Sequence, residues 1–472
     1  MKEKKSFVNF IFFIGAVLLY LAVILYVLYG YICRMDGVYG DTYYAALKTK
    51  YDRIAKVDKP KIVVIGGSSV AFGIDSKLIE QETGMPCVNF GLYAAIGMKP
   101  MLDLSKPFIK SGDIIVVAPE LSSQMYSAYT GYEYLMNSIE ERPDMAFALG
   151  SSYAKGFIRT LPGYISKRSK IKKNGLELSG IYQKSSFDEY GDIVYPRDEN
   201  VMAEGYLETD MPDISGDILT EEFFGMINDY TEYCRSKGAE VYFGFPPVNA
   251  LSAVWSPDEL SAFNEKLLEG LDCAVLSSLE DHILDAGYFY DSNFHTNDPG
   301  TVCNTILLIN DIKRVKNDMT MVLAEIPEPL QIFSTDPGDI KTSGIFLYSL
   351  SEKGIMVKGL TDEGKEETAL TVPDQIDGYK VYGLGSGAFE GSKAKTLLIP
   401  ASVSYISAGI LKDAKDISSI TILSGSLPEV SMEMLSGAPE NIVIYVKKEL
   451  YGKYLTDYFW GLFSDKLKAL ED

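Results

Sequence analysis

The sequence predicts a three-layer α/β/α sandwich with a mainly parallel sheet, preceded by a transmembrane helix and followed by a short solenoid of repeats. Three observations lead to this prediction. Patterns typical of buried strands alternate with helical patterns over residues 60–316, as in parallel sheets covered by helices. A long apolar segment lies near the N-terminus, and it is long enough to cross a bilayer. Similar units recur after residue 344, which indicates a stacked array.

The composition restricts the function before any motif is considered. A chain of 472 residues has room for two or three domains. Its formal net charge of −21 argues against a nucleic-acid partner, because binding to phosphates needs a basic surface. The five cysteines are dispersed, so neither a metal site nor a dense disulfide framework is expected. His282 and His295 are the two histidines, so a histidine-based mechanism must use one of them.

The first 33 residues predict a cytoplasmic tip and a membrane anchor. Residues 7–33 are apolar apart from Asn9, and three lysines precede them. This charge pattern places the N-terminus in the cytoplasm and the bulk of the chain outside, in a single-pass protein of the cell membrane. A cleaved signal peptide is the alternative, but the apolar run is long for one and an Ala-x-Ala site is missing. Residues 34–59 are expected to form a partly helical stalk.

The sandwich is organised around its first strand and the turn that follows it. Residues 62–65 are a β-branched apolar run typical of a buried parallel strand. Gly66 and Gly67 allow a sharp turn, and Ser68 and Ser69 follow. The turn lacks the Gly-Lys-Ser/Thr end of a phosphate-binding loop and the last glycine of Gly-x-Ser-x-Gly. It also has Ser68 where a dinucleotide fingerprint needs glycine at its third position. A serine nucleophile of another kind and a plain tight turn both remain open.

The same alternation continues through the domain. The predicted strands cover residues 87–90, 113–118 and 240–245, and the predicted helices cover residues 222–237, 259–271 and 301–315. Residues 121–217 do not follow this rhythm and are expected to form an insertion over the strand ends. The carboxyl ends of parallel strands meet at one edge of the sheet, where such folds place their chemistry.

A second polar stretch supplies the partners that a serine nucleophile needs. Asp291 and His295 lie on one predicted loop before the last helix. A hydroxyl becomes nucleophilic when an adjacent base takes its proton, and a carboxylate orients that base. Taken singly, His295 is explained as a hydrogen-bonded loop histidine and Asp291 as a turn former. His282 fits no such pattern and is expected to be structural.

The order Ser, Asp, His over residues 60–316 resembles the SGNH/GDSL hydrolase superfamily. The resemblance matches Gly67-Ser68-Ser69 to the Gly-Asp-Ser block, which implies that Ser69 is the nucleophile, and it matches Gly91 to the oxyanion-hole glycine. The backbone N–H groups of Ser69 and Gly91 are then expected to bind the oxyanion.

This sequence departs from the family pattern in two places. The Gly-x-Asn-Asp block is absent, and Glu120 or Ser122 stands after the equivalent strand as a candidate auxiliary residue, as does Ser68 in the first block. The Asp-x-x-His block is one residue longer, between Asp291 and His295. Ser292 stands at the strict position of that block, but Asp291 is preferred, because of the two only its carboxylate can stabilise an imidazolium.

The C-terminal third predicts a separate array. Residues 317–343 contain three prolines and are expected to be a linker. Phe389, Leu411 and Leu435 recur as helical anchors, each followed by a short strand, at residues 397–399, 420–423 and 442–446. Residues 344–446 resemble the BspA-like leucine-rich repeats of bacterial surface proteins. Residues 447–472 are expected to be a helical cap.

Two functions follow as expectations. The resemblance implies a membrane-anchored extracellular serine esterase or O-acyltransferase that acts on acyl groups of cell-envelope glycans and needs no metal or organic cofactor. Water as the acceptor gives an esterase and a sugar hydroxyl gives a transferase, and the sequence does not choose between them. The alternative is a non-catalytic surface protein whose repeats bind a protein or glycan partner on an inert scaffold.

Overall fold

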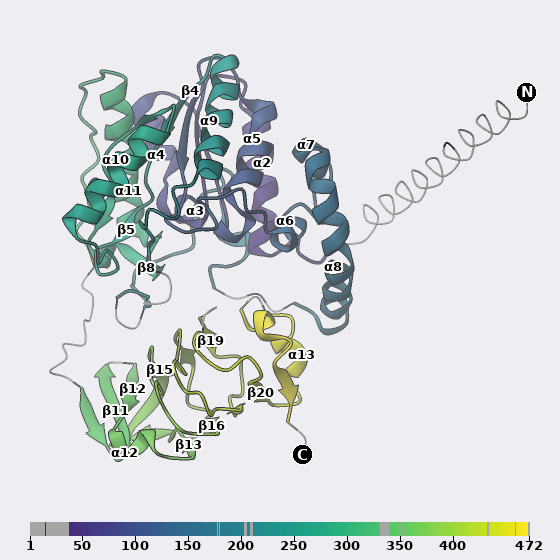
Figure 1. The fold of residues 1–472 in the computed structure, drawn as a ribbon, viewed down its shortest axis with the longest axis vertical. Coiled ribbons are helices and arrows are strands. Elements are labelled where there is room, and N and C mark those ends of the chain that lie inside the picture. Colours follow the sequence, from purple (N-terminus) through teal and green to yellow (C-terminus); the bar gives the residue numbers. More distant parts are fainter. Residues whose placement is uncertain are drawn as a thin grey trace, which may run out of the picture.

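The computed structural model describes residue 15 and residues 37–470, except 177, 179, 203–204, 208–210, 331–339, 352, 432–433 and 458. The described chain forms an α/β domain and a repeat domain, which are joined through residues 316–340 (Figure 1).

The α/β domain is built on a five-stranded sheet with the order β2-β1-β3-β4-β6. Every neighbouring pair in it is parallel. The strands are β1 (Ile62–Gly66), β2 (Cys87–Gly91), β3 (Ile114–Ala118), β4 (Glu240–Phe243) and β6 (Ala274–Val275). Gly66 at the end of β1 lies beside Gly91 on one side and Ala118 on the other. The segments that follow β1, β2 and β3 therefore leave the sheet at one edge.

Helices cover both faces of this sheet, which gives the predicted three layers (Figure 1). The apolar side chains of one face pack with helices α2 (Ala46–Lys56), α5 (Met98–Ser105), α9 (Glu221–Ser236) and α10 (Pro257–Gly270). The other face packs with α4 (Ser76–Thr83) and α11 (Asp298–Val315). The short helix α3 (Ser68–Gly73) begins directly after β1.

Residues 43–56 do not form the predicted stalk. The 3₁₀ turn Tyr43–Ala45 and helix α2 pack on the sheet, and Leu47, Tyr51 and Ile54 of α2 are buried there. These three positions lie at helical spacing, so one face of α2 is apolar and belongs to the core.

The prediction of an N-terminal transmembrane helix is wrong for the described chain. None of its described helices is long and apolar enough to cross a membrane. The longest, α8 (Ala154–Asn174), has 21 residues but is rich in lysine and arginine, and charged side chains are costly in a bilayer. Residues 7–33, apart from Gly15, lie outside the described residues. The single-pass membrane localisation, which rested on that helix, is withdrawn with it.

The segment between β3 and α9 lies outside the five-stranded sheet, as expected for an insertion. It carries α6 (Tyr132–Ser138), α7 (Met145–Leu149) and α8. Some basic side chains of this segment are paired with acidic ones within it: Arg168 forms an ion pair with Glu140, and Lys167 forms one with Glu133.

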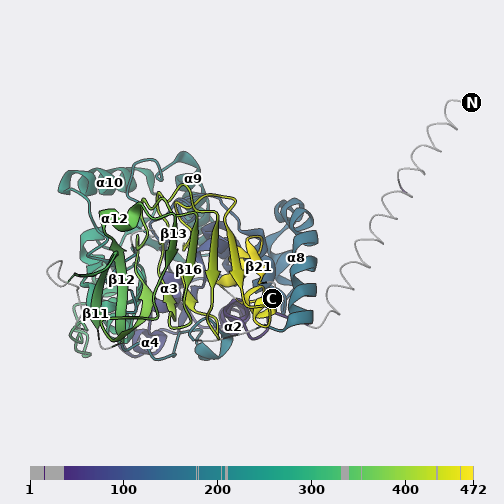
Figure 2. The same cartoon turned by 90° about the horizontal axis from the view of Figure 1, so that it is seen from below.

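The strands of the repeat domain are stacked in two sheets (Figure 2). Most neighbouring strands are parallel, but the first three strands pair antiparallel with one another, and so do Gln375–Ile376 and Tyr379–Lys380. One sheet has the order β13-β16-β18-β20-β21, with β13 (Ala369–Thr371), β16 (Thr396–Ile399), β18 (Ser419–Ile422), β20 (Val443–Val446) and β21 (Leu467–Ala469). The other runs β10-β11-β12-β15-β17-β19, with β10 (Lys341–Ser343), β11 (Phe346–Ser351), β12 (Gly354–Leu360), β15 (Tyr379–Leu384), β17 (Tyr405–Ile406) and β19 (Glu429–Val430).

Two details of the repeat domain differ from the expectation. Phe389 and Leu411 are buried as anchors, but they lie in turns rather than helices. The described part of the C-terminal segment contains the short helix α13 (Tyr451–Tyr454) and a 3₁₀ turn, Trp460–Phe463, before it pairs, through β21, in parallel with β20. That last strand closes the sheet by a long-range pairing that local helical spacing does not reveal.

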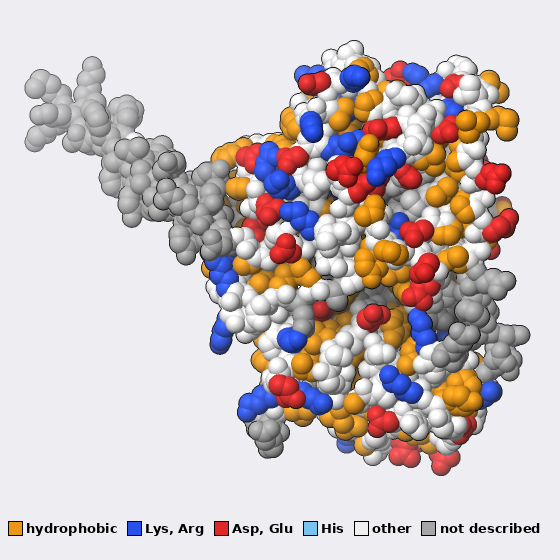
Figure 3. Space-filling model, turned by 180° about the vertical axis from the view of Figure 1, so that it is seen from behind, with side chains coloured by type: hydrophobic (Ala, Val, Ile, Leu, Met, Phe, Trp, Pro, Cys, Tyr) orange, Lys and Arg blue, Asp and Glu red, His pale blue; other side chains and the backbone are white. Residues whose placement is uncertain are grey.

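The two domains are in contact. Together they form one continuous body on the face seen in Figure 3. The ring of Phe459 packs edge-on against Tyr182, with the ring centroids 4.9 Å apart, and Lys353 forms an ion pair with Glu199 at 3.0 Å. Helix α3 and strand β8 (Phe289–Ser292) lie on the side of the α/β domain that faces the repeats (Figure 1).

Candidate active site

The two serines after β1 point in different directions. The Ser68 hydroxyl donates a hydrogen bond to Oε1 of Glu120 over 3.0 Å. The Ser69 hydroxyl is buried without a hydrogen-bond partner among the described residues, and Ser69 lines a small cavity on the α11 face of the sheet. Neighbouring residues of a helix are about 100° apart around its axis, so only one of them faces a given site. Ser68 is the serine at the strand-end site.

The Glu120 side chain contacts the first residues of α3. Its Oε1 accepts the backbone N–H of Ser69 at 2.6 Å as well as the Ser68 hydroxyl. The side chain is buried with its residue 5% exposed. A Cβ atom on Gly67 would lie 2.6 Å from that same oxygen, so glycine at this position is what lets the carboxylate approach. A carboxylate thus accepts hydrogen bonds from donors at the turn where an oxyanion site is expected.

Asp291 and His295 form a hydrogen-bonded pair. Nδ1 of His295 lies 2.7 Å from Oδ1 of Asp291. Strand β8 and the short strand β9 (His295–Thr296) form an antiparallel hairpin, which brings the two side chains together although four positions separate them. Both side chains are mostly buried, with 16% of Asp291 and 10% of His295 exposed. Because Asp291 engages Nδ1, Nε2 is the nitrogen placed to exchange a proton.

Helix α3 carries the platform on which His295 rests. The Phe72 and His295 rings are stacked, with centroids 4.0 Å apart and an interplanar angle of 7°. The backbone of Phe72 also contacts the β8–β9 hairpin, because its carbonyl accepts the hydroxyl of Thr296 at 2.9 Å. Residues four apart share one face of a helix, and the longer side chain leans toward the helix N-terminus. Ser68 therefore lies on the same face of α3 as the ring that supports His295.

Two tyrosines, the buried Tyr43 and the half-buried Tyr182, complete the surroundings of the pair. The Tyr182 hydroxyl donates to Oδ2 of Asp291 at 2.5 Å, and the Tyr43 hydroxyl donates to the backbone carbonyl of Leu92 at 2.7 Å. Burial, followed by the charge of Asp291, raises the pKa of Tyr182 well above its ordinary value. Burial, followed by the charges of Glu120 and Asp291, raises that of Tyr43. Both hydroxyls therefore stay protonated and act as donors.

Gly91 is close to helix α3, but its N–H already donates a hydrogen bond. A Cβ on Gly91 would lie 2.6 Å from the carbonyl oxygen of Gly67 and still closer to Val70. The Gly91 N–H donates to Oδ1 of Asn89 at 3.2 Å. Asn89 also accepts a hydrogen bond from the buried Lys50 ammonium at 3.0 Å. An oxyanion would have to replace Asn89 as the acceptor of this N–H.

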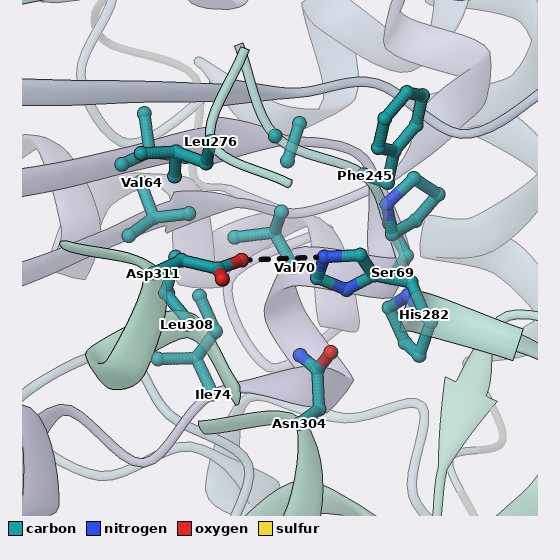
Figure 4. Close-up of a pocket in the computed structure, with 15 residues that line it drawn as sticks. Val64, Ser69, Val70, Ile74, Phe245, Leu276, His282, Asn304, Leu308 and Asp311 are labelled. Atoms are coloured by element: carbon teal, nitrogen blue, oxygen red, sulfur yellow. Dashed lines mark ion pairs between the residues drawn. The ribbon is translucent and has the colours of Figure 1, made fainter. Parts of the chain in front are cut away.

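His282 lies away from the Asp291–His295 pair, on the α11 face of the sheet. It lines the cavity that Ser69 lines (Figure 4). Its Nε2 lies 2.7 Å from the Ser277 hydroxyl and 3.4 Å from Oδ2 of Asp311, and Ser277 donates to the same carboxylate oxygen at 2.5 Å. The side chain of His282 is only 4% exposed, so this cluster is buried between the sheet and α11.

The structure places Ser68, Glu120, Asp291 and His295 at the edge of the sheet where the strands end. Ser69 points instead into the cavity on the α11 face of the sheet. The half-buried Ser122 begins the next turn, where its N–H donates to the carbonyl of Glu120 at 2.7 Å. Sequence reasoning missed Tyr182 and Phe72. Phe72 had a signal, since it lies one helical turn after Ser68; Tyr182 lies in an irregular part of the insertion, where no periodicity pointed to it.

The described residues contain no group of three or more histidine, cysteine, aspartate or glutamate residues placed to hold a metal ion. No family model matches the chain, and no curated protein matches it. Among solved structures, the crystal structure of protein YXIM_BACsu from Bacillus subtilis is similar over 55% of this chain, with 11% identity and a TM-score of 0.27. The match spans 57% of the length of that protein's chain.

Proposed function

We propose that the α/β domain is a serine esterase or acyltransferase in which Ser68, rather than Ser69, is the nucleophile. The single observation that supports this most is the Asp291–His295 pair, joined at 2.7 Å and stacked on Phe72 one helical turn from Ser68. A carboxylate that orients an imidazole beside a serine hydroxyl is the arrangement that activates a weak nucleophile.

The proposed reaction uses these groups in sequence. Rotation about the Cα–Cβ bond of Ser68 releases its hydroxyl from Glu120 and turns it toward His295. Oγ then attacks the ester carbonyl while its proton passes to Nε2 of His295, and Asp291 stabilises the imidazolium. The departing alcohol takes that proton as its bond to the acyl carbon breaks. Water or a second hydroxyl then attacks the acyl-serine and gives its proton to His295. As the bond between the acyl carbon and Oγ breaks, His295 passes this proton to Oγ, which restores the Ser68 hydroxyl and the neutral imidazole.

The substrate class is an acylated glycan, as the sequence resemblance implies. Water as the acceptor makes the protein an esterase, and a sugar hydroxyl makes it an acyltransferase. The groups that carry the proposed reaction are a hydroxyl, an imidazole and carboxylates, which supply nucleophilic and acid–base chemistry.

Labelling with a fluorophosphonate probe tests the proposal. The probe reacts when an activated serine displaces fluoride from phosphorus, so wild-type protein is expected to be labelled, and Ser68→Ala and His295→Ala to lose labelling. Ser69→Ala is the matched control and is expected to keep it. Loss of labelling in folded Ser69→Ala, with labelling retained in Ser68→Ala, would contradict the assignment of the nucleophile.

A second candidate is a non-catalytic binding protein built on the same scaffold. Glu120 favours it, because a carboxylate already accepts the Ser69 N–H at 2.6 Å and would repel a developing oxyanion. In that case the repeat domain supplies the binding surface for a protein or glycan. Folded wild-type protein that the probe never labels would support this candidate over the enzyme.

A further inference from the structure

The C-terminal part of the repeat domain touches the candidate active site through one side chain of the insertion. The Phe459 ring lies edge-on against the Tyr182 ring, with centroids 4.9 Å apart and an interplanar angle of 89°. The Tyr182 hydroxyl donates to Oδ2 of Asp291 at 2.5 Å, and Oδ1 of the same carboxylate meets His295 at 2.7 Å. Three consecutive contacts thus connect the repeat domain to the imidazole.

The Tyr182 ring packs against two other aromatic rings besides Phe459. It lies 5.5 Å from Tyr43 and 6.2 Å from Phe72. Tyr43 and Phe72 belong to the α/β domain, whereas Phe459 belongs to the repeat domain. The Tyr182 ring is therefore packed against side chains of both domains.

We infer that Tyr182 is a positioning residue that shares the charge of Asp291, and that Phe459 couples the docking of the repeat domain to the His295–Asp291 pair. A phenol that donates to one oxygen of a carboxylate draws negative charge away from the other. When Tyr182 is withdrawn, Asp291 interacts more strongly with protonated His295. The repeat domain then sets the basicity of the group that accepts the serine proton. This inference rests on the proposed function only in treating the pair as catalytic.

The titration of His295, followed by NMR of its imidazole in the full chain, tests the coupling directly. The chain has two histidines, so two ring signals are expected, and a His282→Gln variant assigns them. The titration midpoint of His295 is expected at higher pH in Tyr182→Phe and in Phe459→Ala than in wild type. Tyr242→Phe is the matched control, because its hydroxyl donates to the exposed Glu240 at 2.6 Å; it is expected to change nothing.

The remaining outcomes overturn the inference. An unchanged midpoint in Phe459→Ala, with the His282 signal at its wild-type position, would show that the repeat domain is not coupled to the pair. A midpoint at lower pH in Tyr182→Phe would show that Asp291 leaves His295, which contradicts charge sharing. The measurement needs no catalysis, so a wild-type protein that the fluorophosphonate probe fails to label would refute the enzyme without affecting this test.

A second inference comes independently from the cavity that Ser69 lines (Figure 4). Three buried polar atoms without a hydrogen-bond partner among the described residues come from its lining: Oγ of Ser69, Nδ1 of His282 and Oδ1 of Asn304. The cavity volume is about 20 Å³, which is sufficient for one water molecule. Leaving three such atoms unpaired is unfavourable, because each atom loses the hydrogen bonds that it makes with water in the unfolded chain.

We propose that this cavity binds one structural water that bridges the three atoms. The Ser277 hydroxyl donates to Asp311 at 2.5 Å, so its oxygen accepts from Nε2–H of His282, and Nδ1 is left as an acceptor. Nδ2 of Asn304 donates to the carbonyl of Gly73 at 2.8 Å, which fixes Oδ1 as the free acceptor. A water that donates to both acceptors and accepts the Ser69 hydroxyl satisfies all three.

A crystal structure at better than about 2 Å resolution tests this proposal. A density peak within hydrogen-bond distance of all three atoms, about 2.6–3.2 Å, is expected in wild type. The Ser69→Val variant, which places a methyl group in the cavity, is expected to lose the peak. An empty cavity in wild type, or a peak that contacts only one of the three atoms, would refute the bridge.

Discussion

Replacing Glu120 by glutamine tests whether its carboxylate holds the site in a resting state. Oε1 of Glu120 accepts from the Ser69 N–H at 2.6 Å and from the Ser68 hydroxyl at 3.0 Å. Hydrogen bonds to charged groups contribute about 1.5–3 kcal/mol and neutral ones about 0.5–1.5 kcal/mol. Removing the charge therefore weakens the two bonds by roughly 2–3 kcal/mol in total. If both must break before reaction, the Glu120→Gln variant reacts up to about 30- to 150-fold faster, at 1.36 kcal/mol per factor of ten.

The assay is the second-order rate constant for fluorophosphonate labelling of Ser68, measured at one pH for wild type and Glu120→Gln. Glu222→Gln is the matched control, because its exposed carboxylate only accepts the N–H of Ala128, at 3.3 Å. Its labelling rate is expected to equal that of wild type. Slower labelling of Glu120→Gln would refute the reasoning, because it would show that the carboxylate assists the serine. An unchanged rate would show that the carboxylate does not obstruct the reaction.

Three further predictions concern stability. Asp113→Ala leaves the buried Lys61 ammonium, 2.8 Å from the carboxylate with both side chains 0% exposed, without its counter-ion. Urea unfolding is expected to show a loss of about 3–5 kcal/mol, whereas the control Asp58→Ala removes an exposed ion pair with Lys110 and is expected to change little. Phe389→Ala empties a fully buried position of the repeat domain, and a loss of about 3–5 kcal/mol is expected in the same measurement. Burial lowers the pKa of Lys50 to about 7, so above this pH the folded chain has released a proton that the unfolded chain keeps up to about 10.5. The free energy of unfolding is therefore expected to rise with pH in that window, by up to about 1.4 kcal/mol per pH unit. Urea unfolding between pH 7.5 and 9.5 should show less of this rise in Lys50→Met than in wild type.

The strands of the α/β domain were predictable because each is a short apolar run with few alternatives. Residues 62–65 and 113–118 were expected as strands and form Ile62–Gly66 and Ile114–Ala118. Segments whose role depends on distant partners were not predictable in the same way. Residues 43–56 have the pattern of any amphipathic helix, and only the sheet they pack on distinguishes a core helix from a stalk. Residues 467–469 join a sheet whose other strands lie far back in the sequence.

In the candidate site, too, the features that depend on neighbouring residues were predictable from the sequence, and those that depend on distant residues were not. The pairing of Asp291 with His295 depends on a hairpin that the residues around them form, and the longer spacing did not prevent the 2.7 Å contact. The choice between Ser68 and Ser69 depends instead on the direction in which α3 leaves β1. The family pattern implied Ser69, whereas the geometry favours Ser68, because the helix begins at Ser68 and directs the next side chain toward α11.

Glu120, the second residue after β3, then decides which of the two proposed functions the scaffold can perform. An amide at this position donates a hydrogen bond to an oxyanion, whereas the carboxylate of Glu120 accepts from the same donors and repels negative charge. The site can therefore react only if Glu120 withdraws or is neutralised when the substrate binds. Because Glu120 is buried and accepts two hydrogen bonds, withdrawal has an energetic cost that the binding of a substrate must supply. An enzyme of this design would stay inactive until its substrate displaces the carboxylate, and a scaffold whose ligand never displaces it would remain a binding protein.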